Sequence, residues 1–278
     1  SGLRASERAI RELERHGVQV GRSYLVTSGQ ALIESIREAI NSGYRTIVVG
    51  GGDGTISAAV DLLANKPDLT MGLLPFGTGN EVARVLGIPL DLEDACRVVA
   101  HGRVNTVDLA ETGGNYFVHT AMIGYPAQVN SEVPSWLKQR LGKTAYAYTF
   151  LRSIAGARPF RVTMTVGEAR WEGETILVIV GNGQFHTPAS AFLPRSEYAE
   201  SSLLVYTPRS TSWTSLVRLA IDLWVTRRRQ PSLLLFRRAD KVAIVANPPQ
   251  VVDLDGEIAR TTPVTIQIAR NALRVLVP

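Results

Sequence analysis

The sequence contains one cysteine among 278 residues, so no disulfide bond can form within the chain. A chain without internal disulfides fits the reducing environment of the cytoplasm. The cysteine, Cys96, lies in the helical-looking run DLEDACRVVA. Free cysteines are among the most often buried residues, so we expect Cys96 to fill space in the core rather than to act as a reactive thiol.

Long apolar runs are also missing. No uninterrupted stretch reaches the roughly 20 apolar residues that a membrane-spanning helix needs. The opening residues, SGLRASERAI, are charged and indicate the start of a helix rather than a signal peptide. We therefore expect a cytoplasmic protein. If it meets lipid, we expect it to do so from the aqueous side, transiently at the inner face of the membrane.

The overall composition is that of a folded protein, with 45% apolar and 20% charged residues. The net charge of +5 favours anionic partners, which include nucleic acid, anionic membranes and phosphorylated metabolites. Nothing beyond net charge supports binding to nucleic acid, so we expect none. The sequence leaves the oligomeric state open, and a homodimer is one alternative.

Helix and strand signals alternate over the first third of the chain. Residues 23–26 are typical of a short strand, and residues 45–49 form a β-branched run typical of a buried parallel strand. Apolar residues recur at helical spacing in segments 5–15, 30–40 and 56–63. This alternation predicts an α/β domain with a parallel sheet over residues 1–108.

From about residue 105 the pattern changes to short strand-like runs separated by turns. It predicts a mostly antiparallel β domain over residues 109–267, interrupted by two helical stretches at 135–155 and 212–225. The final stretch, 268–278, can pair back onto either domain.

Two stretches, 136–152 and 212–229, combine aromatic, aliphatic and basic residues. Helices of this kind can lie on an anionic membrane, which would make peripheral membrane contact part of the function. Buried helices with solvated basic faces explain the same pattern. Both interpretations stay open.

A glycine-rich turn, Gly50-Gly51-Gly52-Asp53-Gly54-Thr55, separates a buried strand from a helix. Glycine lets the backbone come close to a ligand, and the amides at the start of the next helix favour an anion such as phosphate. We expect Thr55 to cap that helix and Asp53 to bind a ribose hydroxyl, a metal or a neighbouring amide. The alternative is a tight strand-to-helix turn without a ligand.

A second turn of the same kind spans residues 74–84, again between a strand and a helix. Because it lies one α/β unit downstream, both turns should open at the same carboxyl edge of the sheet, where ligands of open α/β folds bind. Two phosphate-friendly turns at one edge predict a nucleotide site. We expect the nucleotide to be bound by Gly51, Gly52, Asp53, Gly54, Thr55, Gly77, Thr78 and Asn80.

Three acidic residues, Asp253, Asp255 and Glu257, alternate in a strand-like segment, so we expect their side chains to share one face. Phosphoryl transfer to an alcohol needs a group that accepts the hydroxyl proton and groups that handle phosphate charge. The alternative interpretation of this segment is a solvated acidic hairpin.

At these residues the sequence resembles the diacylglycerol kinase catalytic superfamily, which includes bacterial lipid kinases and sphingosine kinases. GGDGT is also found in NAD kinases and is only moderately specific, but the later motifs follow in the family's order. The resemblance spans nearly the whole chain. The similar segments lie at 51–55, 75–80, 83–84, 107–109, 142–146, 181–183 and 255–257.

The resemblance implies a kinase with an α/β nucleotide-binding domain, a β-sandwich domain and an active site in the cleft between them, using ATP and Mg²⁺. It makes Glu257 the expected general base and Asp255 its partner or a metal contact, with Asp53 able to share the magnesium. The family's N-P-x-x-G loop would end at about Ser1 and Gly2, so we expect the first strand to be missing from this chain.

Two motifs depart from the family's pattern. Residues 185–189 stand where many bacterial members have a glycine cluster. Within residues 194–203, Glu200 and Ser201 replace an Asp and a Gly. In bacterial relatives this region is associated with a structural magnesium, and the substitutions put that metal in doubt.

The sequence thus predicts a lipid kinase that transfers the γ-phosphate of ATP to the hydroxyl group of diacylglycerol or a related lipid at the membrane surface. One alternative is the same chemistry on a sphingoid base or another alcohol. Another is a nucleotide-binding regulatory module without turnover. An NAD kinase is disfavoured by the segment 75–84.

Overall fold

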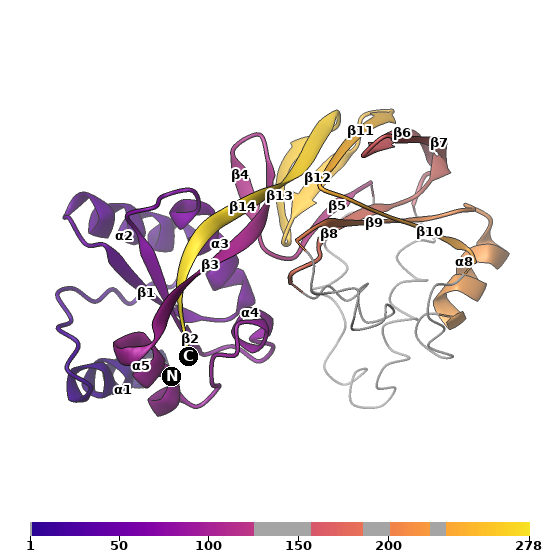
Figure 1. Ribbon diagram of the computed structural model, residues 1–278. Coiled ribbons are helices and arrows are strands. Elements are labelled where there is room, and N and C mark those ends of the chain that lie inside the picture. The colour runs from indigo at the N-terminus through magenta and orange to yellow at the C-terminus, as the bar shows by residue number, and fades with distance from the viewer. Residues whose placement is uncertain (1, 125–156, 186–200, 223–231) are drawn as a thin grey trace. The chain divides into compact units, whose positions relative to one another are not determined.

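Figure 1 shows the computed structural model of the chain, which describes residues 2–124, 157–185, 201–222 and 232–278. The expected helix at 135–155 and the amphipathic stretch at 136–152 lie outside the described residues. Among the helices that are described, none is long and apolar enough to cross a membrane.

The chain divides into two compact units. One comprises residues Ser1–Leu109, Asn115–Val118 and Ala269–Pro278, and the other comprises Ala110–Gly114 and His119–Ile268. The domain boundaries expected from the sequence stay a prediction. Compactness alone does not show that a unit folds by itself as a domain.

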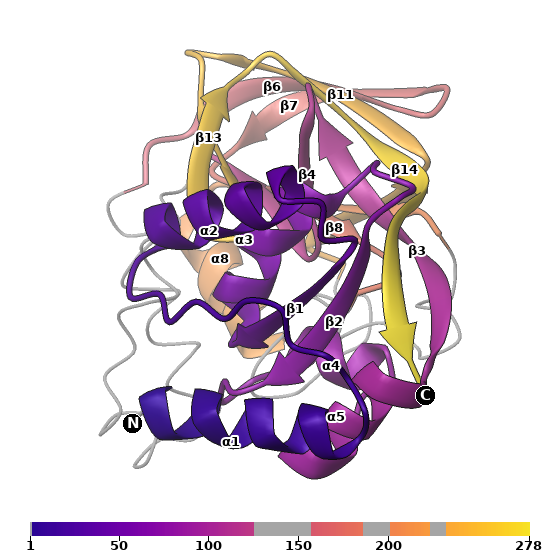
Figure 2. The same ribbon diagram turned by 90° about the vertical axis from the view of Figure 1, so that its left-hand side faces the viewer.

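The first unit is an α/β unit built on parallel strands. Strand β1 pairs in parallel with β2, and β2 pairs in parallel with the last strand, β14. Figure 2 shows α1 and α5 on one side of the β1–β2 pair, and α2 and α3 on the other. The elements are α1 (Gly2–Arg15), α2 (Gly29–Asn41), β1 (Thr46–Gly51), α3 (Asp53–Leu63), β2 (Thr70–Pro75), α4 (Glu81–Val85), α5 (Leu92–His101), β3 (Arg103–Thr112), β4 (Asn115–Phe117) and β14 (Val264–Val277).

Local capping explains where two of these helices begin. Ser28 caps α2 by accepting a hydrogen bond from the amide of Ala31 at 3.2 Å. Asp91 caps α5 by accepting hydrogen bonds from the amides of Glu93 and Asp94 at 2.8 and 3.3 Å. Each cap satisfies amides that have no partner inside the helix.

The expected strand at residues 23–26 is wrong, since this segment is irregular and mostly exposed. A strand needs a neighbour to complete its hydrogen-bond ladder, and within the described residues β1 pairs with β2 alone. The β propensity of Tyr24, Leu25 and Val26 is therefore not used in a sheet.

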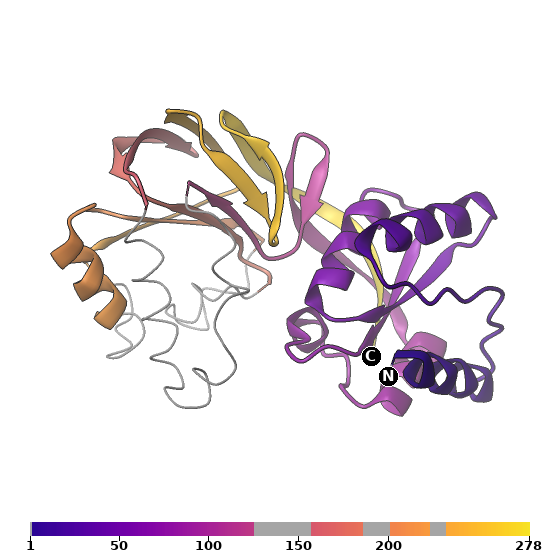
Figure 3. The same ribbon diagram turned by 180° about the vertical axis from the view of Figure 1, so that it is seen from behind.

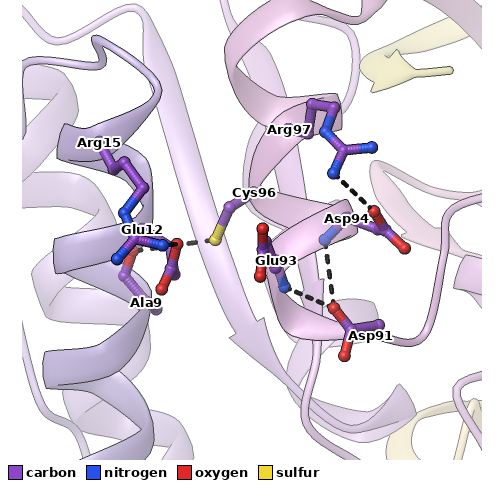
Figure 4. A network of polar contacts seen from close by, with 8 residues as sticks. All are labelled: Ala9, Glu12, Arg15, Asp91, Glu93, Asp94, Cys96 and Arg97. Atoms are coloured by element: carbon purple, nitrogen blue, oxygen red, sulfur yellow. Dashed lines mark hydrogen bonds and ion pairs between the residues drawn. The ribbon is translucent and has the colours of Figure 1, made fainter.

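Cys96 lies in the contact between α1 and α5, as Figure 4 shows. It is fully buried, and its Sγ lies 3.8 Å from the carbonyl oxygen of Ala9. Burial raises the pKa of the Cys96 thiol to about 11, so the thiol is protonated at neutral pH. The expected role as a buried filler is confirmed.

The second unit is built from antiparallel strands. Six of them form one sheet in the order β10-β9-β8-β5-β12-β13, and β14, β11, β6 and β7 pair side by side in the other. This bears out the expected sandwich-like antiparallel fold. The strands are β5 (Thr120–Ile123), β6 (Phe160–Val166), β7 (Ala169–Thr175), β8 (Val178–Asn182), β9 (Leu203–Pro208), β10 (Leu234–Ala239), β11 (Lys241–Asn247), β12 (Val251–Leu254) and β13 (Glu257–Thr261).

Two runs that look like single strands in the sequence are each divided between the two sheets. Residues 115–123 form β4 in one sheet and β5 in the other. Residues 171–182 form part of β7 and then β8. At the second change of sheet, the hydroxyls of Thr175 and Thr207 lie 2.7 Å apart, and the carbonyl oxygen of Leu177 lies within hydrogen-bond distance of both, at 3.1 and 2.9 Å. These buried hydrogen bonds give the carbonyl of Leu177 partners at the point where the chain passes from one sheet to the other.

The last strand, β14, pairs with both kinds of neighbour. Its first part pairs antiparallel with β11, from Val264 to Gln267. Its last part runs parallel to β2, with Val275 opposite Met71. The sequence left open which domain the last stretch joins. In the structure β14 contributes to both units.

Candidate functional site

The first glycine-rich turn joins β1 to α3 and leaves the start of α3 open. Gly52 is the N-cap residue and has no side chain to cap the helix, and the first intrahelical bond runs from the amide of Ile56 to the carbonyl of Gly52 at 3.0 Å. The amides of Asp53, Gly54 and Thr55 therefore have no carbonyl within α3 to bond. Such amides and the helix dipole attract an anion.

The expected capping role of Thr55 is wrong. Helix α3 begins at Asp53, so Thr55 already lies inside its first turn. Its side chain packs on the turn, since a Cβ atom on Gly51 would come within 2.5 Å of the Cβ of Thr55. The cap position belongs to Gly52, whose lack of a side chain leaves room for a ligand.

The second turn joins β2 to α4 and is held by Asn80. The side chain of Asn80 accepts a hydrogen bond from the amide of Gly77 at 2.9 Å and donates one to its carbonyl at 2.7 Å. Asn80 has a φ of 50°, a left-handed conformation that asparagine tolerates better than most residues. Thr78, between them in the chain, is exposed. Asn80 thus shapes the turn, while Thr78 remains accessible.

The two turns lie against each other at the carboxyl ends of β1 and β2. The amide of Phe76 donates to the carbonyl of Gly51 at 3.0 Å. A Cβ atom on Gly77 would lie 2.5 Å from the Cα of Gly52, closer than real Cβ contacts come. Position 77 therefore needs glycine, because the two backbones are themselves in contact.

Asp53 connects the two turns through its carboxylate. Its Oδ1 accepts hydrogen bonds from the amide of Glu81 at 2.7 Å and from that of Val82 at 3.4 Å. The carboxylate thus caps α4 from the first turn of α3. Of the three roles expected for Asp53, the structure shows contact with neighbouring amides, and the metal role stays a prediction.

The acidic segment of the second unit is a hairpin. Strand β12 ends at Leu254 and β13 begins at Glu257, with Leu254 opposite Glu257. The two residues between them, Asp255 and Gly256, have φ values of 51° and 99°. Positive φ at both central positions is the mark of a two-residue type I′ turn, for which Asp-Gly is a favoured sequence.

The expectation that Asp253, Asp255 and Glu257 share one face of a strand is therefore wrong. The chain reverses at Asp255 and Gly256, so the alternation of a continuous strand does not apply. The Asp-Gly pair between two apolar runs was the sequence signal that could have predicted the turn.

Asp255 fastens this turn to the start of β5. Its Oδ1 accepts hydrogen bonds from the amides of His119 and Thr120 at 2.9 and 2.8 Å. Its own amide donates to the carbonyl of Thr120 at 2.9 Å. Sequence reasoning did not anticipate this contact, because nothing in the local pattern of residues 119 and 120 indicates a partner so distant in the chain.

Asp253 lies beneath the turn and is only 2% exposed. Its Oδ1 accepts a hydrogen bond from the amide of Gly256 at 2.8 Å, and its Oδ2 has no partner within the described residues. Burial raises the pKa of Asp253, the amide of Gly256 partly offsets this, and the charges of Asp255 and Glu257 raise it further. Asp253 thus supports the turn from inside.

Glu257 is exposed at the first position of β13. Its side chain makes no hydrogen bond or ion pair with any part of the chain that the structure describes. Of the three acidic residues it alone combines exposure with an uncommitted carboxylate, as a proton acceptor requires.

The residues expected to hold Mg²⁺, Asp53 and Asp255, lie one in each unit. Within the described ranges, no group of three or more histidine, cysteine or acidic side chains could hold a metal ion. Mg²⁺ is commonly held by one or two carboxylates together with substrate phosphates, which fits a carboxylate beside an open helix start. Residues 194–200, where the structural magnesium was in doubt, lie outside the described residues.

Comparison with known protein families identifies both parts of the chain. The family model of the diacylglycerol kinase catalytic domain matches residues 1–112. The model of the YegS C-terminal NAD kinase beta sandwich-like domain matches residues 119–277. This chain belongs to the diacylglycerol kinase superfamily. The resemblance expected from the turn motifs is confirmed.

Curated relatives of this superfamily member carry lipid kinase names. A Pseudomonas aeruginosa protein named "Probable lipid kinase YegS-like" is 28% identical over 87% of this chain and 80% of the relative. A Bacillus subtilis protein named "Diacylglycerol kinase" is 26% identical over 91% of this chain and 84% of the relative. A Shewanella frigidimarina protein, also named lipid kinase YegS-like, is 30% identical over 66% of this chain and 59% of the relative.

Solved structures share the fold. The crystal structure of a diacylglycerol kinase from Bacillus anthracis has a TM-score of 0.67 at 24% identity, covering 92% of this chain and 85% of that chain. A further structure from the same strain gives a TM-score of 0.75 at 23% identity, covering 99% and 92%. At these identities the likeness shows the fold alone.

Proposed function

We propose that this member of the superfamily is an Mg²⁺- and ATP-dependent lipid kinase. It transfers the γ-phosphoryl group of ATP to a lipid hydroxyl, with diacylglycerol or a related lipid as the acceptor. The P–O bond to ADP breaks, a new P–O bond forms to the lipid oxygen, and the hydroxyl proton passes to a carboxylate. The family names of the relatives support the kinase class and leave the acceptor open.

The observation that carries the proposal is the contact between Gly52 and Gly77 beside an uncapped helix start. Two turns that meet at glycines form a surface that phosphate groups can approach closely, and the amides at the start of α3 supply donors. Asp53 holds the second turn in place through the amide of Glu81. A tight structural turn without a ligand has no need for an open helix start.

Glu257 is the proposed general base, because its carboxylate is exposed and uncommitted within the described residues. Asp255 is the proposed partner or metal contact, and its bonds to the amides of His119 and Thr120 hold the turn that carries Glu257. Mg²⁺ would bridge the phosphates and neutralise charge during transfer. The proposal also requires the carboxylate of Glu257 to come close to the glycine-rich turns.

The acceptor can be identified by incubating the full chain with γ-labelled ATP and Mg²⁺. Mixed micelles would present diacylglycerol, a sphingoid base or another lipid alcohol, with NAD tested alongside. We expect labelled phosphatidic acid from diacylglycerol as the main product. Label on the sphingoid base alone would overturn the choice of acceptor, and label on NAD would overturn the lipid kinase class.

Nucleotide binding without transfer to any acceptor would support the regulatory module instead. Titration calorimetry with ATP and Mg²⁺ separates this outcome from a misfolded preparation, because a folded but inactive protein would still bind. We further propose that the protein works in the cytoplasm and reaches its lipid at the inner face of the membrane.

A further inference from the structure

Helix α8 (Trp213–Ala220) has one face buried in the second unit. Leu216, Leu219 and Ala220 are at most 3% exposed, and Leu216 packs against Ile176 and Leu177. The hydroxyl of Ser212 caps the helix by accepting a hydrogen bond from the amide of Ser215. The helix is therefore anchored, and its orientation on the sheet is determined by this apolar contact.

A neighbouring side of α8 carries apolar side chains that are exposed or half-buried. Trp213 is 52% exposed and Ile221, directly after the helix, is 43% exposed. Val217 lies between them and is half-buried. Residues four apart in a helix lie on the same face, so these three form one apolar stripe, which lies about 100° around the helix from the buried side. Figure 1 and Figure 3 show α8 projecting from one end of the six-stranded sheet.

The charged side chains in the segment that carries this stripe are all basic. Between residues 209 and 221 the only charged residues are Arg209 and Arg218, and both are exposed. The nearest acidic residue along the chain, Asp222, is buried. The outer face of α8 therefore combines an indole, aliphatic groups and positive charge, without an exposed carboxylate in this segment.

We propose that the outer face of α8, formed by Trp213, Val217, Arg218 and Ile221, docks onto the anionic phospholipid surface of a bilayer. An exposed apolar stripe gains free energy by entering the headgroup region, where tryptophan is well accommodated. The guanidinium groups of Arg209 and Arg218 match the phosphates of anionic lipid heads. This inference rests on the proposed function, since a kinase whose acceptor stays in the bilayer must bind its surface.

The test measures co-sedimentation of the full chain with vesicles of neutral phosphatidylcholine and with vesicles enriched in phosphatidylglycerol. We expect binding to the anionic vesicles that weakens as salt is raised. The double substitution Trp213→Ser and Ile221→Ser should reduce binding at least about tenfold. Arg218→Gln should reduce it about fivefold, an effect that disappears at high salt.

A matched control is Val245→Ser, because Val245 is also an exposed apolar residue of the second unit, at 53%, but lies on β11. It should bind vesicles like the unchanged protein. Circular dichroism checks that the variants fold, and Arg218→Gln provides a second measurement that leaves the apolar stripe intact. Equal vesicle binding by the unchanged protein and both α8 variants would overturn the proposal, as would equal binding to neutral vesicles.

Docking and kinase function fail in different ways. Phosphorylation of a short-chain diacylglycerol dispersed in detergent does not need a bilayer, so the α8 variants should retain it. If the unchanged protein binds anionic vesicles through α8 but labels no lipid, docking stands and the lipid kinase function is wrong. If the unchanged protein labels the short-chain lipid but binds no vesicles, the docking surface is wrong, and a protein partner for the stripe becomes the better explanation.

Discussion

Asp53 and Asp255 each accept hydrogen bonds from two consecutive backbone amides far away in the sequence. The separation is 28 residues for Asp53 and Glu81, and 136 residues for Asp255 and His119. In both cases a carboxylate in a glycine-containing turn holds a second segment against that turn. The two acidic turns thus share a structural role. Interpreting their motifs only as binding or catalytic motifs does not reveal it.

The surroundings of the two carboxylates differ. Asp53 lies at the open start of α3, where unbonded amides favour an anion. Asp255 lies in a type I′ turn, directly before Gly256 and the exposed Glu257. One turn therefore suits the binding of phosphate, and the other presents a carboxylate suited to accepting a proton. A buried or bonded carboxylate in a motif organises a site, while the exposed one beside it is the better candidate for chemistry.

The largest effect is expected for Glu257→Gln, which removes the proposed base and keeps the shape of the side chain. A general base contributes about 10²–10⁴-fold to the rate, so kcat should fall by that factor while the affinity for ATP stays nearly unchanged. Steady-state kinetics and ATP titration measure the two quantities. Glu174→Gln, a change at an exposed strand glutamate of the same unit, is the control and should be neutral. A near-normal rate for Glu257→Gln would show that Glu257 is not the general base. The proposed difference between a phosphate-binding turn and a proton-accepting turn would then be wrong.

Next in size is Gly77→Ala, which tests the contact between the glycine-rich turns. The new Cβ would lie 2.5 Å from the Cα of Gly52, so one turn must move. Overpacking of this kind costs about 1–3 kcal/mol, and we expect ATP affinity to fall at least about tenfold. Gly29→Ala is a suitable control, because a Cβ atom there meets nothing within 4 Å. Unchanged ATP affinity for Gly77→Ala would mean that nucleotide binding does not depend on this contact.

A smaller effect is expected when the capping carboxylate is removed by Asp53→Ala. Loss of a helix cap costs about 0.5–2 kcal/mol in the free energy of unfolding. Asp53→Asn keeps an acceptor for the amides of Glu81 and Val82, so its stability should recover most of this loss. Urea denaturation measures both variants. If Asp53→Asn is stable but loses Mg²⁺-dependent ATP binding, Asp53 also contacts the metal. If Asp53→Asn binds ATP as the unchanged protein does, the role of Asp53 is structural alone.

The smallest effect concerns Asp253, and it depends on pH. Because burial raises the pKa of Asp253 above its unfolded value of about 3.9, the folded state holds the proton more tightly. The stability that this gives is complete below the unfolded pKa and is lost as pH rises toward the folded pKa. Asp253→Asn cannot ionise, so its free energy of unfolding relative to the unchanged protein should increase as the pH rises above the unfolded pKa of about 3.9. Parallel pH profiles for the two proteins would contradict the raised pKa.

Parts of the fold and site follow from local sequence. The segments 30–40, 45–49 and 56–63 carry helix and strand periodicities that the structure keeps as α2, β1 and α3. The glycines of the first turn stand directly between β1 and α3, as the pattern indicates. The strand expected at 23–26 failed because a strand also needs a partner, and a partner cannot be read from four residues.

The sequence by itself determined the alternation of helix and strand, the two glycine-rich turns and the acidic segment, because periodicity and turn residues act over a few neighbours. Only the tertiary structure decided that Asp53 caps α4, that Asp255 binds the amides of His119 and Thr120, and that residues 115–123 change sheets. Hydrogen bonds between segments far apart depend on how the whole chain packs. No local pattern encodes them, and they determine which acidic side chains are bonded to backbone amides.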